Sequence, residues 1–432
     1  MLIIYNLFLI AIPVICLPCL AVLLVYVYLT PKYKGRLMRR LGFGLADKVL
    51  GLPSGTPRIW IHALSVGEVS SARSLVNGLR KKYPDAVLLF SASTRSGEEY
   101  AASVFKDAVD SFIPFPLDLF WSTEKFVQTV NPDLFVLVET DLWPNFLGSI
   151  RRHKIRSILV NGRMSEESFA NYRKLAFFFA PMLSTFDYLT LQTDAEKRKM
   201  MELGVSEGKI RSLGNLKYDG LAGGGRTGKG ANDPADSAGG KTIWVAGSTH
   251  TGEEELLLAA FARLRKKFPD LYLVIAPRNV ERGRELSALA AKSGFQAVRR
   301  SEGGDLAGDL LILDTLGELA GFYELCTVAF VGGSLVQERG HNPLEPAALG
   351  KPVIFGPHME DFQEIAADLV NCGGAKVVTR VEEIDHTLGD WLSDDLAASG
   401  TGMKCAELVK SMQGVTEKHL ELVEQILAGG NP

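Results

Sequence analysis

The sequence predicts an α/β protein with two similar domains, each a parallel β-sheet between layers of helices. Three observations support this prediction. The chain has 432 residues, which is more than one hydrophobic core usually serves. Short, nearly continuous apolar runs alternate with helical patterns in two separate series, as in parallel sheets that are buried on both faces. Residues 221–240, rich in Gly, Ser, Asp and Lys and without periodicity, separate the two series and indicate a flexible linker.

The elements of both series can be placed along the chain. In the first series we expect strands at residues 59–64, 87–92, 134–138, 157–160 and 188–191, with helices such as 69–82 and 165–179 between them. In the second we expect strands at residues 242–246, 271–276, 310–313, 328–331 and 352–355, with helices at 253–267, 280–293 and 361–370. This alternation favours two Rossmann-like domains that face each other across a cleft, at residues 32–220 and 241–394. Residues 395–432 form a separate C-terminal helical segment in this prediction.

The N-terminus has a different character. Residues 7–29 carry no charge and are almost wholly apolar, and about 20 such residues span a bilayer as a helix. Five basic residues follow at once: Lys32, Lys34, Arg36, Arg39 and Arg40. Positive charge after a span stays on the cytoplasmic side, so we expect a signal anchor at residues 1–31 and cytoplasmic domains. A cleaved signal peptide would carry its charge before the apolar run. A helix that enters only half of the bilayer stays open, because Pro13 and Pro18 would kink a span.

The net charge and the cysteine content argue against two classes of protein, those that bind nucleic acid and those held by disulfides. The net charge of −3 gives no reason to expect nucleic acid as a partner. The five cysteines are odd in number and scattered, which argues against a disulfide framework and favours a reducing compartment.

Charged residues follow the strands of the first domain, where ligands bind in parallel sheets. Glu68 opens a helix after the strand at 59–64, and Glu139 and Asp141 follow the strand at 134–138. A carboxylate there suits a general base that deprotonates a hydroxyl group. The alternatives are a helix-start carboxylate for Glu68 and a solvated loop for the second motif. Lys217, near the end of this domain, either neutralises phosphate or carboxylate charge or is an ordinary surface lysine.

The second domain carries several loops that suit a nucleotide. Residues 247–254 join a strand to a helix, and Thr251 and Glu254 have capping-box spacing, so exposed helix amides could hold an anion. The small residues at 332–334 would let backbone amides approach a phosphate. Arg278 lies just past a strand, and Glu345 suits a ribose diol.

Taken in order, these motifs resemble the 3-deoxy-D-manno-octulosonic acid (Kdo) transferases. The resemblance rests on SVGE at 65–68, ETDLWPN at 139–145, NGR at 161–163, GNLKYD at 214–219, GSTHTGEEE at 247–255, APR at 276–278, LGEL at 316–319, FVGGSLV at 330–336 and GHNPLEPA at 340–347. It runs from Met1 to about Val370, and the linker and the C-terminal tail carry little of it.

The resemblance implies a GT-B fold and an inverting transfer of Kdo from CMP-Kdo to a lipid A precursor, at the cytoplasmic face of the bacterial inner membrane, in lipopolysaccharide synthesis. Carried over by position, it implies that Glu68 is the proton acceptor and that Glu139 and Lys217 stabilise the transition state. The CMP-binding residues that it implies are Pro277, Arg278, Leu316, Gly317, Glu318, Asn342, Pro343, Leu344 and Glu345. We expect no cofactor and no metal ion, because CMP-Kdo is a substrate and a nucleoside monophosphate ester.

Three other functions are alternatives to this one. The first is another GT-B transferase that uses a UDP-sugar and a lipid-linked acceptor. The second is a membrane-tethered protein that binds a nucleotide sugar without catalysis, which would not need Glu68. The third is a UDP-sugar epimerase of the same fold, which would not need a membrane span.

Overall fold

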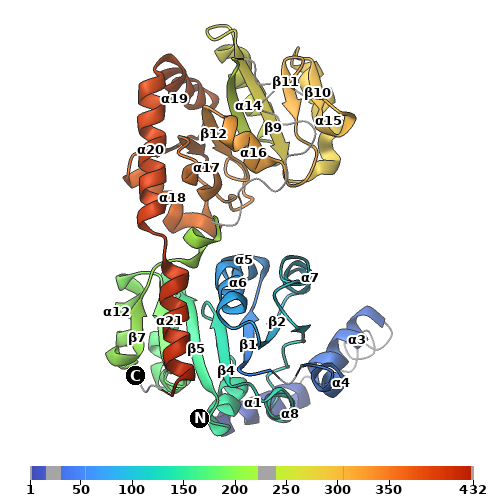
Figure 1. Ribbon diagram of the computed structural model, residues 1–432, viewed down its shortest axis with the longest axis vertical. Helices are drawn as coiled ribbons and strands as arrows, with labels where there is room; N and C mark the ends of the chain where they lie inside the picture. The colour runs from blue at the N-terminus through green and yellow to red at the C-terminus, as the bar shows by residue number, and fades with distance from the viewer. Residues whose placement is uncertain (1, 16–30, 54, 222–239, 305, 430–432) are drawn as a thin grey trace. The chain divides into compact units, whose positions relative to one another are not determined.

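The chain folds into two compact units. The computed structural model describes residues 2–15, 31–53, 55–221, 240–304 and 306–429 (Figure 1). One unit comprises Met1–Gly220 with Gly414–Pro432, and the other comprises Leu221–Gln413. Each contains a seven-stranded sheet in which all pairs are parallel. The expectation of two parallel-sheet α/β domains is therefore confirmed.

The first sheet has the strand order β3-β2-β1-β4-β5-β6-β7. Its strands are β1 (Arg58–Ala63), β2 (Val87–Ala92), β3 (Ser111–Phe112), β4 (Leu134–Val138), β5 (Arg156–Gly162), β6 (Tyr188–Leu191) and β7 (Ile210–Ser212). The five predicted strands are present, and the short edge strands β3 and β7 are additional. The chain runs outward from β1 in one direction and from β4 in the other, so the switch point lies between these two strands. Ile61 is paired with Phe90 on one side and Val136 on the other.

Helices bury both faces of this sheet. One face is covered by α5 (Val66–Ser71), α6 (Arg73–Lys82), α7 (Arg95–Val104) and α21 (Val415–Leu427). The other is covered by α4 (Leu45–Leu50), α8 (Phe120–Val130), α9 (Pro144–Arg152), α11 (Ala176–Leu183) and α12 (Asp194–Glu202). Trp60 centres the second layer, where its ring lies 5.1 Å from that of Phe146 and its Nε1 donates to Ser91 Oγ at 2.8 Å. This two-sided burial explains why the strands are nearly continuous apolar runs.

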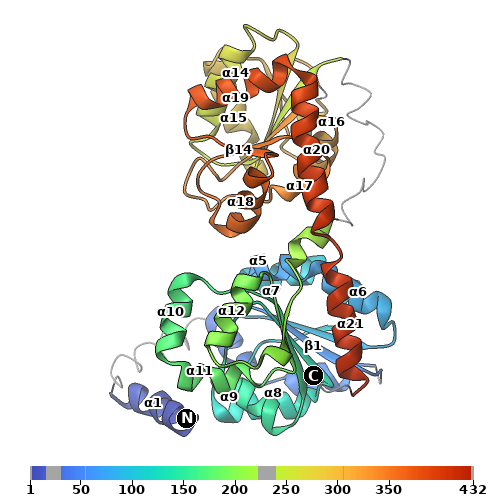
Figure 2. The same ribbon diagram turned by 90° about the vertical axis from the view of Figure 1, so that its left-hand side faces the viewer.

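The C-terminal residues divide between the two units. Helix α20 (Asp395–Ser411) belongs to the second unit, and α21 returns to the first, where it packs beside α6 (Figure 2). Side chains of the first unit hold α21 at two points. The His419 ring is 2.8 Å from Thr190 Oγ1, and the Asp219 carboxylate accepts from the amides of Gly414 and Thr416. The segment at 395–432 is thus not one body, because each helix buries its own apolar face against a different sheet layer.

The N-terminal helices α1 (Leu2–Ile15) and α3 (Pro31–Arg40) flank a stretch outside the described residues, 16–30, on which much of the expected anchor falls. Helix α1 contacts the first unit through Tyr5, whose hydroxyl donates to Asp118 at 2.9 Å, and through Asn6, which bonds Asn145 at 2.8 Å. Within the described ranges, no helix combines the length and the apolarity that crossing a membrane requires.

The second sheet has the order β10-β11-β9-β8-β12-β13-β14, with its switch point between β8 and β12. Its strands are β8 (Thr242–Thr249), β9 (Leu271–Pro277), β10 (Ala297–Arg299), β11 (Leu310–Ile312), β12 (Val328–Val331), β13 (Val353–Phe355) and β14 (Ala375–Val377). One face packs against α14 (Glu254–Leu264), α15 (Gly283–Lys292), α19 (Val381–Ser393) and α20, and the other against α16 (Leu319–Leu325). Helices α17 (Leu344–Ala348) and α18 (Gln363–Asn371) contact α20. The expected linker falls almost wholly on residues 222–239, outside the described residues.

Helix α20 packs against a backbone turn through a glycine, which allows a stability test. A Cβ atom on Gly402 would lie 1.8 Å from the carbonyl oxygen of Gly350, whereas a Cβ atom on Gly400, in the same helix, would meet nothing within 4 Å. We expect Gly402→Ala to lower the free energy of unfolding by about 1–3 kcal/mol, because the helix must move away from the turn. Gly400→Ala should be neutral or stabilising by up to about 1 kcal/mol. Denaturant unfolding of the full chain compares the two variants, and equal stability would contradict this packing.

Candidate active site

Glu68 lies at the switch point of the first sheet, directly after β1. Its carboxylate accepts a hydrogen bond from the backbone amide of Leu64, and the side chain is half-buried. Burial, followed by the neighbouring carboxylate of Glu139, raises the pKa of Glu68 to about 8. A carboxyl group with such a pKa exchanges its proton near neutral pH, which is what a general base requires.

Glu139 ends the adjacent strand, β4, and is buried. Its carboxylate accepts from Arg163 Nε at 3.2 Å and from Ser71 Oγ at 3.4 Å. Its φ of 60° lies in the left-handed region, which is strained for a glutamate. Such strain concentrates at functional sites. The structure therefore brings the predicted residues Glu68 and Glu139 together, with Arg163 as the charge partner of the second.

Lys217 follows the last strand of the same sheet. The loop is held by Asn161 at the end of β5, whose side-chain oxygen accepts from the amide of Leu216 at 2.9 Å. The amide of Lys217 itself donates to Asn215 Oδ1 at 3.0 Å. These bonds place the loop at the carboxyl edge of the sheet, the edge that also carries the two glutamates.

His62, within β1, was not predicted as part of the site. Its ring is fully buried, stacks on Phe115 at 3.6 Å between centroids, and has its Nδ1 2.9 Å from Ser91 Oγ. The Nε2 atom lies 3.9 Å from the carboxylate of Asp141, in the loop after Glu139. Burial lowers the pKa of His62, so the ring is neutral at physiological pH. A histidine in an otherwise apolar strand was the only sequence signal for it.

In the second unit, Glu253 is the central side chain of the loop after β8. It is fully buried, and its carboxylate accepts from the amides of His250, Gly333, Ser334 and Leu335 at 2.8–2.9 Å. The predicted capping box of Thr251 and Glu254 is wrong: α14 begins without a side-chain cap, and Glu254 pairs with Arg282 at 2.8 Å.

The role expected of the small residues at 332–334 also needs correction. Their position at the end of β12 is as predicted, but the amides of Gly333 and Ser334 already donate to Glu253. A buried carboxylate of the protein therefore occupies the place expected for a phosphate. Little in the sequence indicates this contact, because Glu253 is one of three consecutive glutamates at a helix start.

Beside this loop, basic side chains meet at the switch point of the second sheet. Pro277 is the last residue of β9, and the amide of Arg278 donates to Thr249 O at 2.9 Å. The Nε2 atoms of His250 and His341 lie 2.7 Å apart. Burial, followed by the charges of His250 and Arg278, lowers the pKa of His341 to about 4. The guanidinium of Arg278 is thus the positive charge at the ends of β8, β9 and β12, and a cation at this sheet edge suits a phosphate ester.

The other predicted nucleotide residues flank this site in two groups. Asn342 and Pro343 lead into α17, where Asn342 Oδ1 accepts from the amide of Leu344, and its Nδ2 donates to Glu345 at 3.4 Å. Burial raises the pKa of Glu345.

The second group follows β11. Leu316 is 81% exposed, and Gly317 has a φ of 87°. Burial alone would raise the pKa of Glu318, but hydrogen bonds from Arg300 and Thr315 outweigh it and lower the pKa. Glu318 is therefore an ionised acceptor that Arg300 holds in place.

Comparison with known proteins identifies the chain's relatives. Residues 35–220 match the family model of 3-deoxy-D-manno-octulosonic-acid transferase (kdotransferase). The Haemophilus influenzae 3-deoxy-D-manno-octulosonic acid transferase is 33% identical over 411 residues, which cover 92% of this chain and 93% of that protein. The protein of the same name from Chlamydophila psittaci is 31% identical over 343 residues, 78% of each chain.

A solved structure shows the same fold over both units. The UDP-GlcNAc 2-epimerase of Neisseria meningitidis, bound to UDP-GlcNAc, matches with a TM-score of 0.56 at 13% identity and covers 84% of this chain and 100% of that one. At this identity the likeness concerns the fold alone, which is of the GT-B type. Identity to the curated relatives extends over nearly the whole chain, so this protein belongs to the Kdo transferase family of glycosyltransferases.

Proposed function

We propose that this enzyme transfers Kdo from CMP-Kdo to a lipid A precursor of the lipid IVA type, with inversion at the anomeric carbon, in lipopolysaccharide synthesis. The observation that carries the proposal is the pair Glu68 and Glu139 at the switch point of the first sheet, where one carboxylate raises the pKa of the other. The family relationship over nearly the whole chain supports Kdo as the transferred sugar.

In the proposed reaction, Glu68 takes the proton of the acceptor hydroxyl group. At the same time, the oxygen of that hydroxyl group forms a bond to the anomeric carbon of Kdo. The bond from that carbon to the phosphate oxygen breaks, and CMP leaves with the electron pair. Lys217 and Glu139 are assigned to stabilising the transition state, with Arg163 orienting the carboxylate of Glu139.

The second unit is assigned to the nucleotide. Arg278 supplies positive charge for the phosphate of CMP, and His250 and His341 lie beside this arginine. The residues at 316–318 and 342–345 are assigned to the base and the ribose, for which Glu318 and Glu345 offer carboxylates. The reaction needs no metal ion in this scheme, because the donor has a single phosphate.

We further propose that the protein works at the cytoplasmic face of the bacterial inner membrane, held by its N-terminal segment. The apolar run at 7–29 and the basic residues after it support this orientation. An anchor would keep the enzyme beside an acceptor that cannot leave the bilayer.

The assignment of the base predicts a large effect on turnover. Glu68→Gln keeps the shape of the side chain but removes its capacity to accept a proton, so kcat should fall by about 10²–10⁴. Glu167→Gln, an exposed glutamate of α10 (Glu166–Lys174), is the matched control and should behave as wild type. Turnover is measured by mass spectrometry of the lipid product from purified enzyme, CMP-Kdo and acceptor. Near wild-type turnover in a folded Glu68→Gln enzyme would exclude this base.

The raised pKa predicts a pH profile. The base must be ionised, so kcat/KM should rise with pH and level off above about 8, the pKa of Glu68. Glu139→Gln removes a neighbouring negative charge, so its residual activity should level off at a lower pH than that of the wild type. An inflection at the same pH in both enzymes would show that the two carboxylates are not coupled.

The nucleotide assignment predicts selective inhibition by the product. CMP should compete with CMP-Kdo, and UDP should compete far more weakly. Arg278→Ala should raise the inhibition constant of CMP about tenfold, because a charge-assisted hydrogen bond to phosphate is lost. The exposed Arg284 on α15 provides the control variant Arg284→Ala. Equal inhibition by UDP and CMP would instead favour a UDP-sugar donor.

A further inference from the structure

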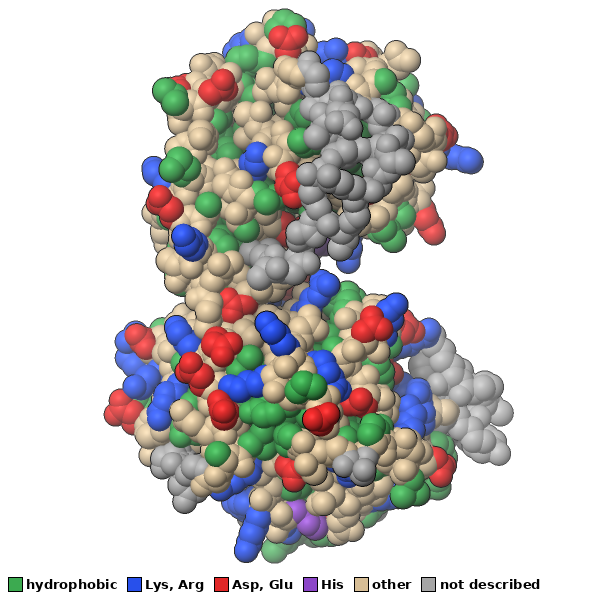
Figure 3. Space-filling model, viewed as in Figure 1, with side chains coloured by type: hydrophobic (Ala, Val, Ile, Leu, Met, Phe, Trp, Pro, Cys, Tyr) green, Lys and Arg blue, Asp and Glu red, His purple; other side chains and the backbone are tan. Residues whose placement is uncertain are grey.

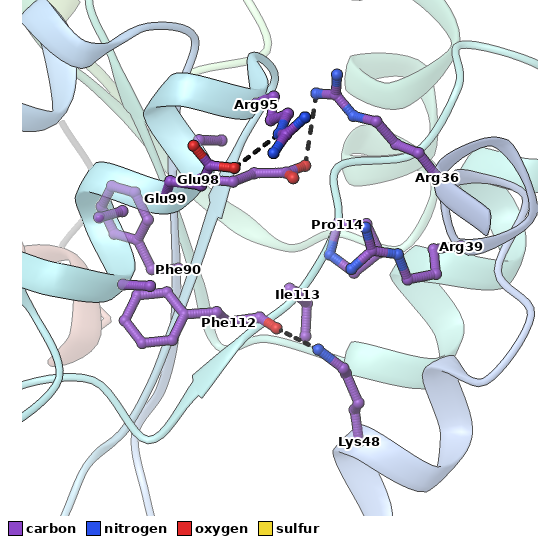
Figure 4. A pocket seen from close by; sticks show the side chains of 13 residues that line it. Arg36, Arg39, Lys48, Phe90, Arg95, Glu98, Glu99, Phe112, Ile113 and Pro114 are labelled. Carbon is purple, nitrogen blue, oxygen red and sulfur yellow. Dashed lines mark hydrogen bonds and ion pairs between the residues drawn. The ribbon is translucent and has the colours of Figure 1, made fainter. Parts of the chain in front are cut away.

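Apart from the residues at Glu68, the first unit contains a cavity whose lining combines cations with apolar side chains. The cavity measures about 380 Å³ and lies between α3 and α4 on one side and β2 and α7 on the other (Figure 4). Its cations are Arg36, Arg39, Lys48 and Arg95. Its apolar walls include the buried residues Phe90 and Ile113. None of these residues has a role in the reaction described above.

The charge of the pocket is not balanced internally. Arg36 lies 3.6 Å from the carboxylate of Glu98, and Arg95 lies 2.6 Å from that of Glu99. These two pairs leave the charges of Arg39 and Lys48. In the described part of the chain, Arg39 forms no ion pair or hydrogen bond, and Lys48 Nζ donates only to the backbone carbonyl of Phe112 at 2.8 Å. The four cations and two carboxylates therefore leave two positive charges facing the cavity.

The two unbalanced cations also repel each other. Burial lowers the pKa of Lys48, and the nearby guanidinium of Arg39 lowers it further. An anion between them would relieve both effects. Figure 3 shows basic and acidic side chains intermixed on the visible face of the first unit, so this local excess contrasts with the mixed charge seen there.

Hydrogen bonds connect the pocket to the proposed base. Arg36 Nη2 donates to Ser93 O at 2.6 Å. The amide of Ser93 donates to Ala63 O at 3.2 Å. Leu64 directly follows Ala63, and its amide donates to the carboxylate of Glu68. The pocket thus opens at the carboxyl end of β2, one strand away from Glu68 at the end of β1.

We propose that this pocket binds a phosphate group of the acceptor lipid and so holds the acceptor hydroxyl beside Glu68. A phosphate monoester carries between one and two negative charges at neutral pH, close to the charge that the pocket leaves unbalanced. Guanidinium and ammonium groups are the usual partners of phosphate, and the apolar walls suit the sugar or acyl parts next to it. This inference rests on the proposed function, since it assigns the ligand to the acceptor.

The test compares acceptors with and without phosphate groups on the purified full-length enzyme. With the phosphorylated acceptor, Arg39→Ala and Lys48→Ala should each raise the KM for acceptor about tenfold, while kcat and the KM for CMP-Kdo stay within about twofold of wild type. With the dephosphorylated acceptor, wild type and variants should have the same raised KM. Arg39→Lys should restore most of the affinity. Arg198→Ala, an exposed arginine on α12, is the matched control and should leave every constant unchanged.

Two results would overturn the proposal. One is an equal loss for both acceptors in the Arg39 and Lys48 variants, which would show a structural role. The other is competition by vesicles of an anionic phospholipid, with affinity lost in the same variants, which would assign the pocket to bulk lipid headgroups.

Binding measured without CMP-Kdo separates this inference from the proposed function. If the enzyme binds the phosphorylated acceptor through Arg39 but transfers no Kdo to it, the pocket stands and the assigned reaction fails. If it transfers Kdo but binds both acceptors equally well, the reaction stands and the pocket assignment fails.

Discussion

The constraint on which the rest of this structure depends is that every strand pair in both sheets is parallel. Parallel strands need a crossover after each strand, so each sheet is covered by helices and its strands are buried on both faces. All strand-end loops then lie on one edge. Where the strand order reverses, the two neighbouring loops diverge to opposite faces and leave room for a ligand. Glu68 and Glu139 occupy that position in the first sheet, and the residues after β8 and β12 occupy it in the second.

The carboxylates of Glu253 and Glu68, one in each unit, have different surroundings. Glu253 accepts hydrogen bonds from four backbone amides and thereby shapes the loop. Glu68 accepts a hydrogen bond from one amide, and burial, followed by the carboxylate of Glu139, destabilises its charged form and raises its pKa to about 8. Glu253 thus has a structural role, whereas Glu68 has the raised pKa that a group active in proton transfer near neutral pH needs. The same reasoning distinguishes Glu318, which Arg300 holds in the ionised form.

The first unit also suggests how a lipid acceptor would be positioned. The basic pocket and the proposed base lie at the ends of adjacent strands, joined by hydrogen bonds from Arg36 through Ser93 to β1. Two cations of the pocket come from α3 and one from α4, the helices that follow the apolar N-terminal run. The basic residues after the apolar run thus do not all have the same position, because Arg36 and Arg39 line the pocket.

Much of this protein could be predicted from the sequence, since local patterns carry the information. Apolar runs of the right length identified the ten principal strands, and charged residues directly after them, such as Glu68, Glu139 and Arg278, marked the sheet edges. Tertiary structure alone decided which distant groups meet. Nothing local in the sequence distinguishes Glu253 from Glu254 and Glu255, but the fold brings the amides of residues 333–335 to its carboxylate. Likewise, His62 stands in an apolar strand, and the fold places its ring 3.9 Å from the carboxylate of Asp141. The local sequence also does not predict that α20 and α21 belong to different units. Burial, pKa shifts and charge balance arise from contacts between residues remote in sequence, which only the folded chain creates.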